Sequence, residues 1–116
     1  KAFDYALRLD PNYADAWFSK GNALASQSKY GEAIQAYDEA IRLDPLNADA
    51  WYNKGTALGK QDNPNDAIKA FNEAIRLDPN NAKAAWHNKG VALEALGRTA
   101  EADVAYAKAR ELEYTG

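Results

Sequence analysis

Apolar and small residues recur three and four positions apart along most of the chain, with polar residues between them. This is the spacing of one face of an α-helix. Over residues 14–28 the periodic set is Trp17, Gly21, Leu24 and Ala25. Over residues 30–43 it is Ala33, Ile34, Tyr37, Ala40 and Ile41. The pattern predicts one helix over each of these two ranges.

The same pattern returns after 34 residues, as the separation of Trp17 from Trp51 shows. Further pairs at this step are Gly21 and Gly55, Leu24 and Leu58, Ala33 and Ala67, Tyr37 and Phe71, and Ala40 and Ala74. A third copy, displaced by one extra residue within 80–85, contains Trp86, Gly90, Leu93, Ala102, Tyr106 and Ala109. A fixed period of this length indicates a repeat protein. Each copy is predicted to be one helical hairpin.

Residues that begin and end helices stand at the ends of these segments. The Asp-Pro pairs at 44–45 and 78–79 end the second helix of a copy, because the residue before proline is disfavoured in the helical conformation. Asn63 followed by Pro64 is typical of a helix start. Asn12 and Asn47 are expected to cap the first helices of two copies.

The order of Trp, Gly, Leu, Ala, aromatic residue and Pro resembles the tetratricopeptide repeat family over essentially the whole chain. The resemblance implies an all-α solenoid of helix-turn-helix hairpins that forms a right-handed superhelix. We expect the end of a preceding repeat at 1–13 and three repeats at 14–47, 48–82 and 83–116. Two departures are Tyr114 in place of the closing Pro, and lysine in place of the Leu before the glycine, at Lys20, Lys54 and Lys89. The lysine stems are expected to pack while the ammonium groups reach water.

The repeated residues are interpreted as packing residues. Trp17, Trp51 and Trp86 lie at helical spacing in register with each copy, which favours a packing role over a ligand site. In the family's geometry the glycine of each copy faces an alanine across the hairpin, in the pairs Gly21 and Ala33, Gly55 and Ala67, and Gly90 and Ala102. Tyr37, Phe71 and Tyr106 are expected to fill the space between neighbouring repeats.

The last copy differs from the others in its second helix. The differing positions are Ile34 and Ile41 in the first copy, Ile68 and Ile75 in the second, and Asp103 and Arg110 in the third. A terminal repeat needs a polar outer face, so we expect the natural array to stop here. The chain starts at Lys1 without Met, and Leu7 keeps the apolar character of Ile41. We therefore expect a longer parent with earlier repeats, and self-association through the half-repeat 1–13.

In this family the first helices line a concave groove that binds extended or helical segments of other proteins. The matching positions give these candidate peptide-binding residues: Asp15, Phe18, Ser19, Asn22 and Ser26; Asp49, Tyr52, Asn53, Thr56 and Lys60; and Ala84, His87, Asn88, Val91 and Glu94. Phe18, Tyr52 and His87 hold equivalent places and are expected to form an aromatic row. Beside it, Asn53 and Asn88 offer both a donor and an acceptor to a peptide backbone.

The same resemblance limits the ligand. Relatives that bind acidic C-terminal peptides of chaperones carry a clamp of cationic and asparagine side chains. Asn22 and Asn53 match this clamp, but the cationic positions are held by Phe18, Ala84 and Asn88. Three groove carboxylates stand against the ammonium of Lys60, which gives the groove a net charge of −2. A neutral, apolar or mildly basic partner segment is therefore expected.

Composition narrows the chemistry further. The 116 residues are 47% hydrophobic and 27% charged with a net charge of −3. The pI of about 5.1 argues against a nucleic-acid partner, because phosphate contacts need a basic face. No apolar run approaches the roughly 18 residues of a membrane span. With no Cys and one His, the chain has no thiol chemistry, and we expect neither a cofactor, a metal nor catalysis.

Three weaker signals have local explanations. The segment 62–66, Asp-Asn-Pro-Asn-Asp, suggests a calcium loop but lacks its Gly and distal Glu, and is interpreted as a capped turn. His87 has no nucleophile beside it and is interpreted as a groove residue. The recurring arginines are expected to pair within their helices, Arg8 with Asp4, Arg42 with Asp38 and Arg76 with Glu73, at about 0.3 kcal/mol each.

The sequence thus predicts a protein-interaction module, with a scaffold or adaptor role, that uses Tyr52 and Asn53 as its central contacts. The alternative is a structural array that stacks on itself or on neighbouring domains, with the groove as solvated surface. The compartment and the partner's identity stay open, because one architecture serves many processes.

Overall fold

The computed structural model describes residues 2–115, and their side chains as far as residue 113. Within this part the chain is all-helical. The α-helices are α1 (Ala2–Leu9), α2 (Ala14–Ser26), α3 (Tyr30–Leu43), α4 (Ala48–Lys60), α5 (Pro64–Leu77), α6 (Lys83–Ala95) and α7 (Thr99–Thr115). A short 3-10 helix, Pro79–Asn81, precedes α6. Lys1 and Gly116, the outer ends of the expected units 1–13 and 83–116, lie outside the described residues.

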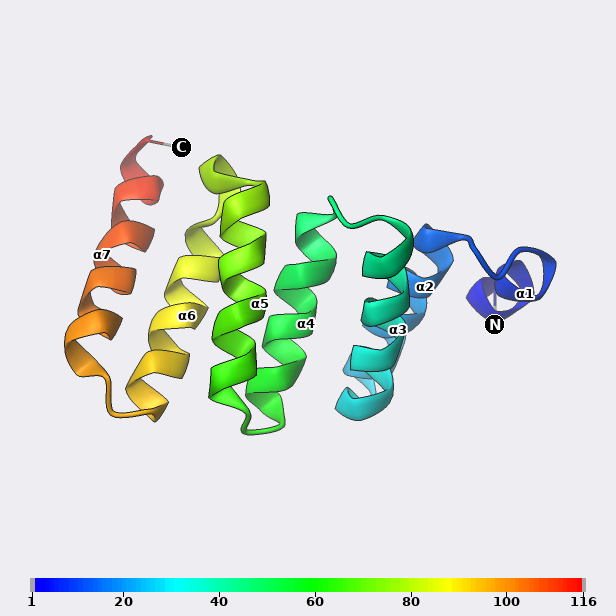
Figure 1. Cartoon of the computed structure of the whole chain (residues 1–116), viewed down its shortest axis with the longest axis horizontal. Helices are drawn as coiled ribbons and strands as arrows, with labels where there is room; N and C mark the ends of the chain where they lie inside the picture. Colours follow the sequence, from blue (N-terminus) through cyan, green and yellow to red (C-terminus); the bar gives the residue numbers. More distant parts are fainter. Residues whose placement is uncertain (1, 116) are drawn as a thin grey trace.

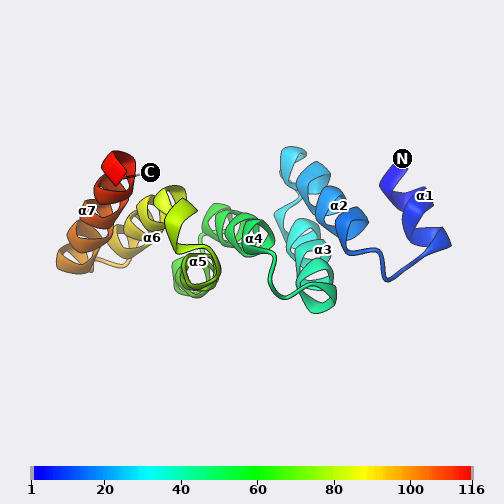
Figure 2. The same cartoon turned by 90° about the horizontal axis from the view of Figure 1, so that it is seen from above.

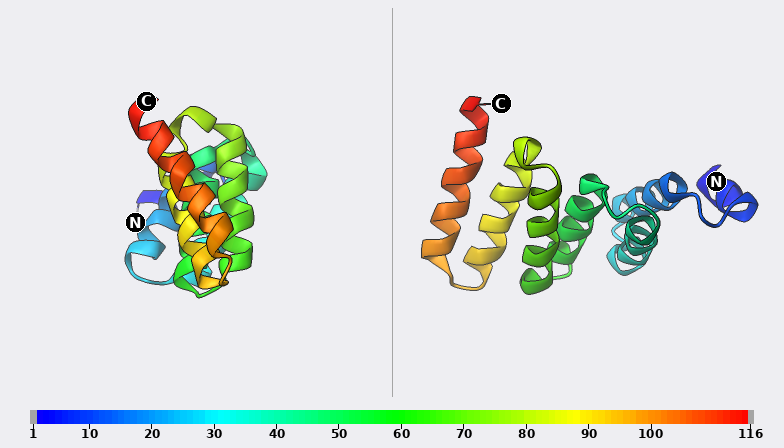
Figure 3. Two further views of the ribbon diagram at one scale, coloured as in Figure 1. Left: turned by 90° about the vertical axis from the view of Figure 1, so that its left-hand side faces the viewer. Right: turned by 45° about the horizontal axis from the view of Figure 1, so that its top comes forward.

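The helices form a row of antiparallel hairpins, α2 with α3, α4 with α5 and α6 with α7, and α1 packs on α2 (Figure 1). The row measures 48 × 29 × 20 Å. Figure 2 shows α2 and α4 on one side of the row and α3 and α5 on the other. Seen end-on, successive hairpins cross at an angle (Figure 3, left). The expected all-α solenoid of helical hairpins is confirmed.

Each hairpin turn has the same backbone geometry. After α2, the Lys29 N–H donates to the carbonyl of Leu24 at 2.9 Å and the Ser28 N–H to that of Ala25 at 2.9 Å, which satisfies carbonyls at the helix end. The left-handed residue of the three turns is Ser28 (φ 61°), Asp62 (φ 62°) and Gly97 (φ 76°). The first helix of a copy therefore ends at residue 26, two residues before the expected end.

The predicted helix starts are right in part. Asn47 caps α4, since its Oδ1 accepts from the Ala50 N–H at 3.1 Å. The N-cap of α2 is Tyr13, so the prediction for Asn12 was wrong by one residue. Asn63 stands at the N-cap of α5 with Pro64 at the first helical position, but its side chain donates to Asp66 at 3.0 Å and makes no cap hydrogen bond.

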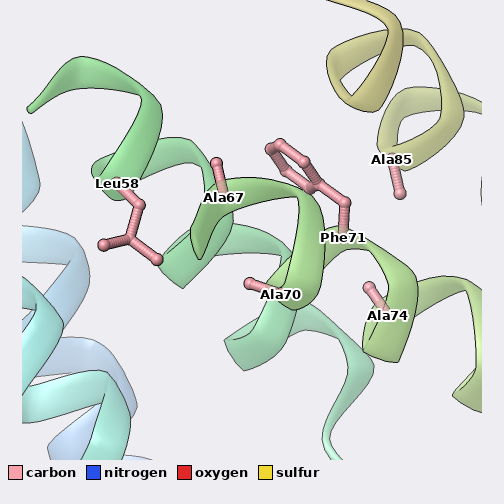
Figure 4. Packing of buried hydrophobic residues seen from close by; sticks show 6 residues of the cluster. All are labelled: Leu58, Ala67, Ala70, Phe71, Ala74 and Ala85. Atoms are coloured by element: carbon pink, nitrogen blue, oxygen red, sulfur yellow. The ribbon is translucent and has the colours of Figure 1, made fainter. Parts of the chain in front are cut away.

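The core is built from small residues around one aromatic ring in each hairpin. The first hairpin buries Ala33 and Tyr37 with Ala57 of the next one, and the second buries Phe71 together with Ala85 of α6 (Figure 4). The expectation that these rings lie between neighbouring repeats is confirmed for Tyr37 and Phe71.

The partner of each repeated glycine is a ring, not the expected alanine. A Cβ placed on Gly21 would lie 2.5 Å from Cε1 of Tyr37, and on Gly55 it would lie 2.7 Å from Cε1 of Phe71. Gly90 has the same relation to Tyr106 at 2.6 Å. The glycine makes room for the aromatic ring, so the fit depends on the ring's position rather than on two small residues in contact.

The repeated tryptophans and lysines pack on one another within each first helix. Trp51 packs against the cluster around Phe71, and Trp86 against the one around Leu93. The repeated lysines lie over the tryptophan rings of their own helices, Lys20 over Trp17, Lys54 over Trp51 and Lys89 over Trp86, at 5.5, 5.4 and 4.9 Å from the ring centroids. The packing role assigned to the tryptophans is confirmed for Trp51 and Trp86.

Ion pairs differ from the local pairing that the sequence suggested. Asp38 pairs with Lys54 of the next hairpin at 2.7 Å, and Asp4 pairs with Lys20 at 3.2 Å. Arg42 binds Glu39, three residues before it, instead of Asp38. The predicted pair of Arg76 with Glu73 forms at 2.8 Å. Asp4 and Asp38 therefore join their helices to the next hairpin.

Ile34 of α3 and Ile68 of α5 pack on the following hairpin, as expected. Ile34 lies against the cluster around Phe71, and Ile68 against Leu93 and Ala102. Asp103 and Arg110, their counterparts on α7, are exposed. The outer face of α7 is therefore more polar than the corresponding faces of α3 and α5.

Candidate functional site

The residues predicted to bind a ligand all lie on α2, α4 and α6. These helices follow one another along one side of the row, where α2 contacts α4 and α4 contacts α6. We call this side the inner face. The half-buried members are Phe18, Asn22, Tyr52, Asn53, Thr56 and Asn88. The exposed members are Asp15, Ser19, Ser26, Asp49, Lys60, Ala84, His87, Val91 and Glu94.

The predicted aromatic row packs against a second row from the following helices. The ring pairs are Phe18 with Tyr37, Tyr52 with Phe71 and His87 with Tyr106, with centroids 6.1, 5.8 and 5.3 Å apart and interplanar angles of 50, 49 and 49°. Such tilted contacts are the favourable geometry for aromatic pairs. One face of each inner ring is thus fixed by its own hairpin.

Hydrogen bonds tie the inner face together across helices. Asn22 Oδ1 accepts from Tyr37 Oη at 2.6 Å and from Asn53 Nδ2 at 2.9 Å. Asn88 Nδ2 donates to Tyr52 Oη at 2.9 Å. Burial raises the pKa of Tyr37, which keeps its hydroxyl protonated as a donor. These bonds leave Nδ2 of Asn22 and Oδ1 of Asn53 unused.

The third repeat differs from the first because its buried-side tyrosine bonds a carboxylate instead of an amide. Tyr106 Oη donates to Glu94 Oε1. This hydrogen bond, with smaller contributions from burial and from the charges of Glu94 and Asp103, raises the pKa of Tyr106 to about 12. Glu94 therefore serves as an acceptor for its own hairpin, while its negative charge remains at the surface.

A hollow of about 310 Å³ opens on the inner face between α4 and α6. Four predicted residues line it, namely Thr56, Lys60, Asn88 and Val91. The sequence analysis did not identify Gly59, Pro64 and Phe71, which also line it. The alignment of the repeats held a signal for Gly59, because this glycine stands where the other two copies have Ala25 and Glu94, which both carry a side chain.

A second, wider hollow of about 620 Å³ lies between α6 and α7 and includes Ala84, His87 and Asn88. Neither hollow is lined by the other predicted residues, which are Asp15, Phe18, Ser19, Asn22, Ser26, Asp49, Tyr52, Asn53 and Glu94. The two hollows therefore lie beside the hydrogen-bonded row and toward the α6 end of the inner face.

The described residues contain no cluster of three or more His, Asp or Glu side chains able to hold a metal ion. Within the same range no helix is long and apolar enough to cross a membrane. The segment 62–66, considered above as a calcium loop, forms the turn into α5.

The repeat pattern matches a known family along nearly the whole chain. A sequence model described as tetratricopeptide repeat matches residues 1–48, 20–82 and 52–113. The chain belongs to the tetratricopeptide repeat family. Members of this family are typically non-catalytic protein-interaction modules, and the repeat array has that general role. No curated protein sequence matches the chain.

Solved tetratricopeptide repeat structures are similar to this chain. A crystal structure of MamA shares 29% identity with a TM-score of 0.93, and covers 97% of this chain and 66% of its own. MamA from Desulfovibrio magneticus RS-1 shares 26% with a TM-score of 0.90, covering 97% of this chain and 63% of its own. The chain thus spans just under two thirds of these MamA chains.

A third structure is the first tetratricopeptide repeat domain of Spaghetti (RPAP3), solved bound to the HSP90 peptide SRMEEVD. It shares 30% identity with a TM-score of 0.83, and covers 89% of this chain and 81% of its own. The peptide in that structure is acidic. In the present chain, the three positions that the sequence analysis matched to clamp cations hold Phe18, Ala84 and Asn88. Phe18 packs on Tyr37, and Asn88 donates a hydrogen bond to Tyr52.

Proposed function

We propose that the array binds a segment of a partner protein on its inner face, with Tyr52 and Asn53 as the central contacts and a scaffold or adaptor role. The observation that carries this proposal is the hydrogen-bonded row of amides and rings across α2, α4 and α6. Both residues lie on α4, the middle helix of the three.

The row supports binding because its side chains are already held in place. Asn53 is fixed by its bond to Asn22, and Tyr52 by its contact with Phe71 and its bond from Asn88. A ligand therefore pays little of the entropy of ordering these side chains. The Asn53 carbonyl oxygen left over by these bonds is an acceptor for a peptide N–H.

The charges on the inner face favour a neutral, apolar or mildly basic segment. Asp15, Asp49 and Glu94 are exposed on this face, and Lys60 is the opposing cation of the predicted set. Complementary charge across an interface selects the partner and speeds its approach. An acidic peptide of the kind bound by the RPAP3 domain is therefore expected to bind poorly here.

The test is a peptide-library selection on the array beside a variant carrying Tyr52→Ala and Asn53→Ala. We expect the wild-type chain to enrich a motif and the variant to lose it. A control variant with Glu73→Ala and Arg76→Ala removes an exposed ion pair on α5 and is expected to keep the motif. Thermal unfolding of all three chains separates lost binding from lost folding.

The groove proposal fails if the wild-type chain enriches no motif, or if the Tyr52 and Asn53 variant enriches the same one. Peptides with excess positive charge and excess negative charge should be compared in the same experiment. Preference for the acidic set would contradict the predicted charge of the ligand. The location of the site is tested separately, by the variant that carries Tyr52→Ala and Asn53→Ala.

A second candidate function is self-association through α1. Tyr5 and Leu9 of this helix are 59% and 71% exposed, whereas Leu43 and Leu77, at the positions equivalent to Leu9, are half-buried. Exposed apolar side chains in a group favour contact with another protein surface. Sedimentation of the wild-type chain and a Tyr5→Ser, Leu9→Ser variant over a concentration series tests it, since only the wild-type chain should associate.

A further inference from the structure

The hollow between α4 and α6 exists because its walls are made of small residues. Gly55 and Gly59 lie one turn apart on α4, and a Cβ placed on Gly59 meets nothing within 4 Å. On the opposite side, α6 presents Val91 and Ala95. The ring of Phe71 on α5 also lines the hollow. We call this hollow of about 310 Å³ the α4–α6 pocket.

At the equivalent place between α2 and α4, larger side chains pack together. There Tyr37 packs in a buried cluster with Ala33 and Ala57, and Ala25 and Tyr30 pack against it. In the α4–α6 pocket three of these groups are replaced by smaller ones. The replacements are Ala25 by Gly59, Tyr30 by Pro64 and Tyr37 by Phe71. These reductions in volume at one place favour an open space.

The pocket's lining is mostly apolar and its charges balance. Phe71, Val91 and Ala95 supply hydrocarbon surface, and the charged residues of the lining are one cation, Lys60, and one anion, Asp62. The Thr56 hydroxyl donates to the carbonyl of Tyr52 in its own helix at 3.2 Å. An uncharged side chain therefore enters without leaving a charge unpaired, whereas an ammonium or carboxylate group gains no net partner inside.

The volume indicates how large that side chain is. A dry apolar cavity of about 150 Å³ in another protein holds a benzene molecule, so a pocket of about 310 Å³ accommodates a phenyl or indole ring with room to spare. A single aliphatic side chain would leave part of it empty, and empty space forfeits dispersion contacts.

We propose that the α4–α6 pocket binds one aromatic side chain, Phe or Trp, of the partner segment, and that this ring is the segment's anchor. The inference rests on the proposed function, because it places the anchor on the same inner face as Tyr52 and Asn53. Asn88 joins the two sites: it lines the pocket and donates to Tyr52 Oη. A segment that contacts the row can thus insert a ring beside it.

The pocket can be filled without unfolding the chain. Gly59→Leu adds a side chain where the first carbon has open space, and it improves helix propensity by up to about 1 kcal/mol. Ala95→Leu fills the pocket from the opposite wall. The matched control is Gly31→Leu, an exposed helical glycine of α3 whose nearest neighbour is the flexible end of Gln61 at 3.4 Å.

The first measurement uses N-acetyl-tryptophanamide, N-acetyl-leucinamide and N-acetyl-lysinamide as probes in amide NMR titrations of the whole chain. We expect the tryptophan probe to shift the signals of Gly59, Val91 and Ala95 saturably at millimolar concentration. The leucine probe should act more weakly and the lysine probe not at all. Gly59→Leu and Ala95→Leu should weaken the tryptophan probe at least tenfold, and Gly31→Leu should leave it unchanged.

The second measurement repeats the titration with peptides from the library selection, so that the two proposals can fail separately. Some selected peptides could require Tyr52 and Asn53 and yet bind the Gly59→Leu variant as tightly as the wild-type chain. That result overturns the pocket proposal and leaves the groove function standing. The tryptophan probe could bind the wild-type chain but not the Gly59→Leu or Ala95→Leu variants, while the library selection enriches no motif. That result overturns the groove function and leaves a pocket that binds an aromatic group. Absence of any saturable shift at Gly59 and Val91 overturns the pocket directly.

Discussion

The junction between α3 and α4 and the junction between α5 and α6 join the same kinds of helices in different ways. At the first junction, Asp38 pairs with Lys54 at 2.7 Å and Asn47 caps α4. At the second, Asn72 stands in the place of Asp38, and one extra residue creates the 3-10 helix before α6. The N-cap there is Ala82, which makes no side-chain hydrogen bond.

The two junctions also differ on the inner face. Asn22 receives hydrogen bonds from Tyr37 and Asn53 at the first, and the α4–α6 pocket opens beside Phe71 at the second. The second junction keeps one polar link on this face, from Asn88 to Tyr52 Oη at 2.9 Å, but the Asn22 position holds Thr56, which bonds only within its own helix. The comparison teaches that one repeated backbone can provide a rigid platform and an open pocket side by side, through the choice of a few side chains.

The largest effect is expected from adding a methyl group at the repeated glycines. In Gly21→Ala the new Cβ would lie 2.5 Å from the Tyr37 ring, which is held by its bond to Asn22. We expect a loss of about 2 kcal/mol in the free energy of unfolding, within the range for overpacking. In Gly55→Ala the Phe71 ring has no hydroxyl and can move toward the pocket, so the loss should be no more than about 1 kcal/mol.

Denaturant unfolding measures both variants, with Gly59→Ala as the control. That change is on the same helix but has open space around the Cβ, so it should stabilise the chain by about 0.5–1 kcal/mol. Equal losses for Gly21→Ala and Gly55→Ala would contradict the difference in ring mobility.

The next effect tests the hydrogen-bonded platform. Asn22→Ala removes the acceptor of Tyr37 Oη and Asn53 Nδ2, and leaving a buried donor without a partner costs about 1–3 kcal/mol. Thr56→Ala, the equivalent change at the second junction, removes only a bond to its own helix and should change stability by less than about 0.5 kcal/mol. Urea unfolding measures the loss of stability in both variants. Similar losses would contradict the difference between the two junctions.

The sequence was sufficient for the repeat, the hairpins and the inner-face helices, because these depend on local periodicity that recurs at a fixed step. Predictions failed where the identity of a side chain's partner depends on how closely two helices are placed. Asp38 was matched with Arg42 on its own helix but reaches Lys54, and Gly21 was matched with Ala33 but faces the Tyr37 ring. Both partners depend on how adjacent helices are placed.

The pocket was missed for a different reason. Hydrophobic spacing identifies which residues face inward. The pattern is the same at both junctions, with Ala33 and Tyr37 at the first and Ala67 and Phe71 at the second. Space is set by differences in volume between equivalent residues, such as Tyr30 and Pro64. No single position signals the pocket, because the smaller residues act together only when α4, α5 and α6 surround them.

The helix cap gives a third comparison of the junctions. Asn47→Ala removes the acceptor of the Ala50 N–H, 3.1 Å away, and loss of an N-cap typically costs about 1 kcal/mol. The second junction has no such bond to lose, because Ala82 already stands at the N-cap of α6. Amide hydrogen exchange should therefore show faster opening at the start of α4 in the variant, with α6 unaffected. Faster exchange in α6 as well would indicate that the two junctions unfold together.

The smallest effect concerns the ion pair on the outer side. Asp38→Asn removes the partner of Lys54 and should cost about 0.5 kcal/mol, since a pair this exposed contributes little. The reverse change, Asn72→Asp, should give Lys89 a carboxylate and a similar gain, and both effects should shrink in high salt.

The pKa of Lys89 shows directly whether the new carboxylate of Asn72→Asp reaches its ammonium group. Burial lowers its pKa from the ordinary 10.5, so the folded chain binds its proton less tightly than the unfolded chain does. This contribution makes stability rise with pH across the window between the lowered pKa and 10.5. A carboxylate at residue 72 favours the charged ammonium, and should raise the pKa of Lys89 and flatten that rise. An NMR titration of the lysine side chains follows the change, with Lys54 as the internal reference. An unchanged pKa of Lys89 in Asn72→Asp would mean that the extra residue before α6 has moved the two positions out of reach. In that case the insertion, and not the loss of the carboxylate, distinguishes the second junction from the first.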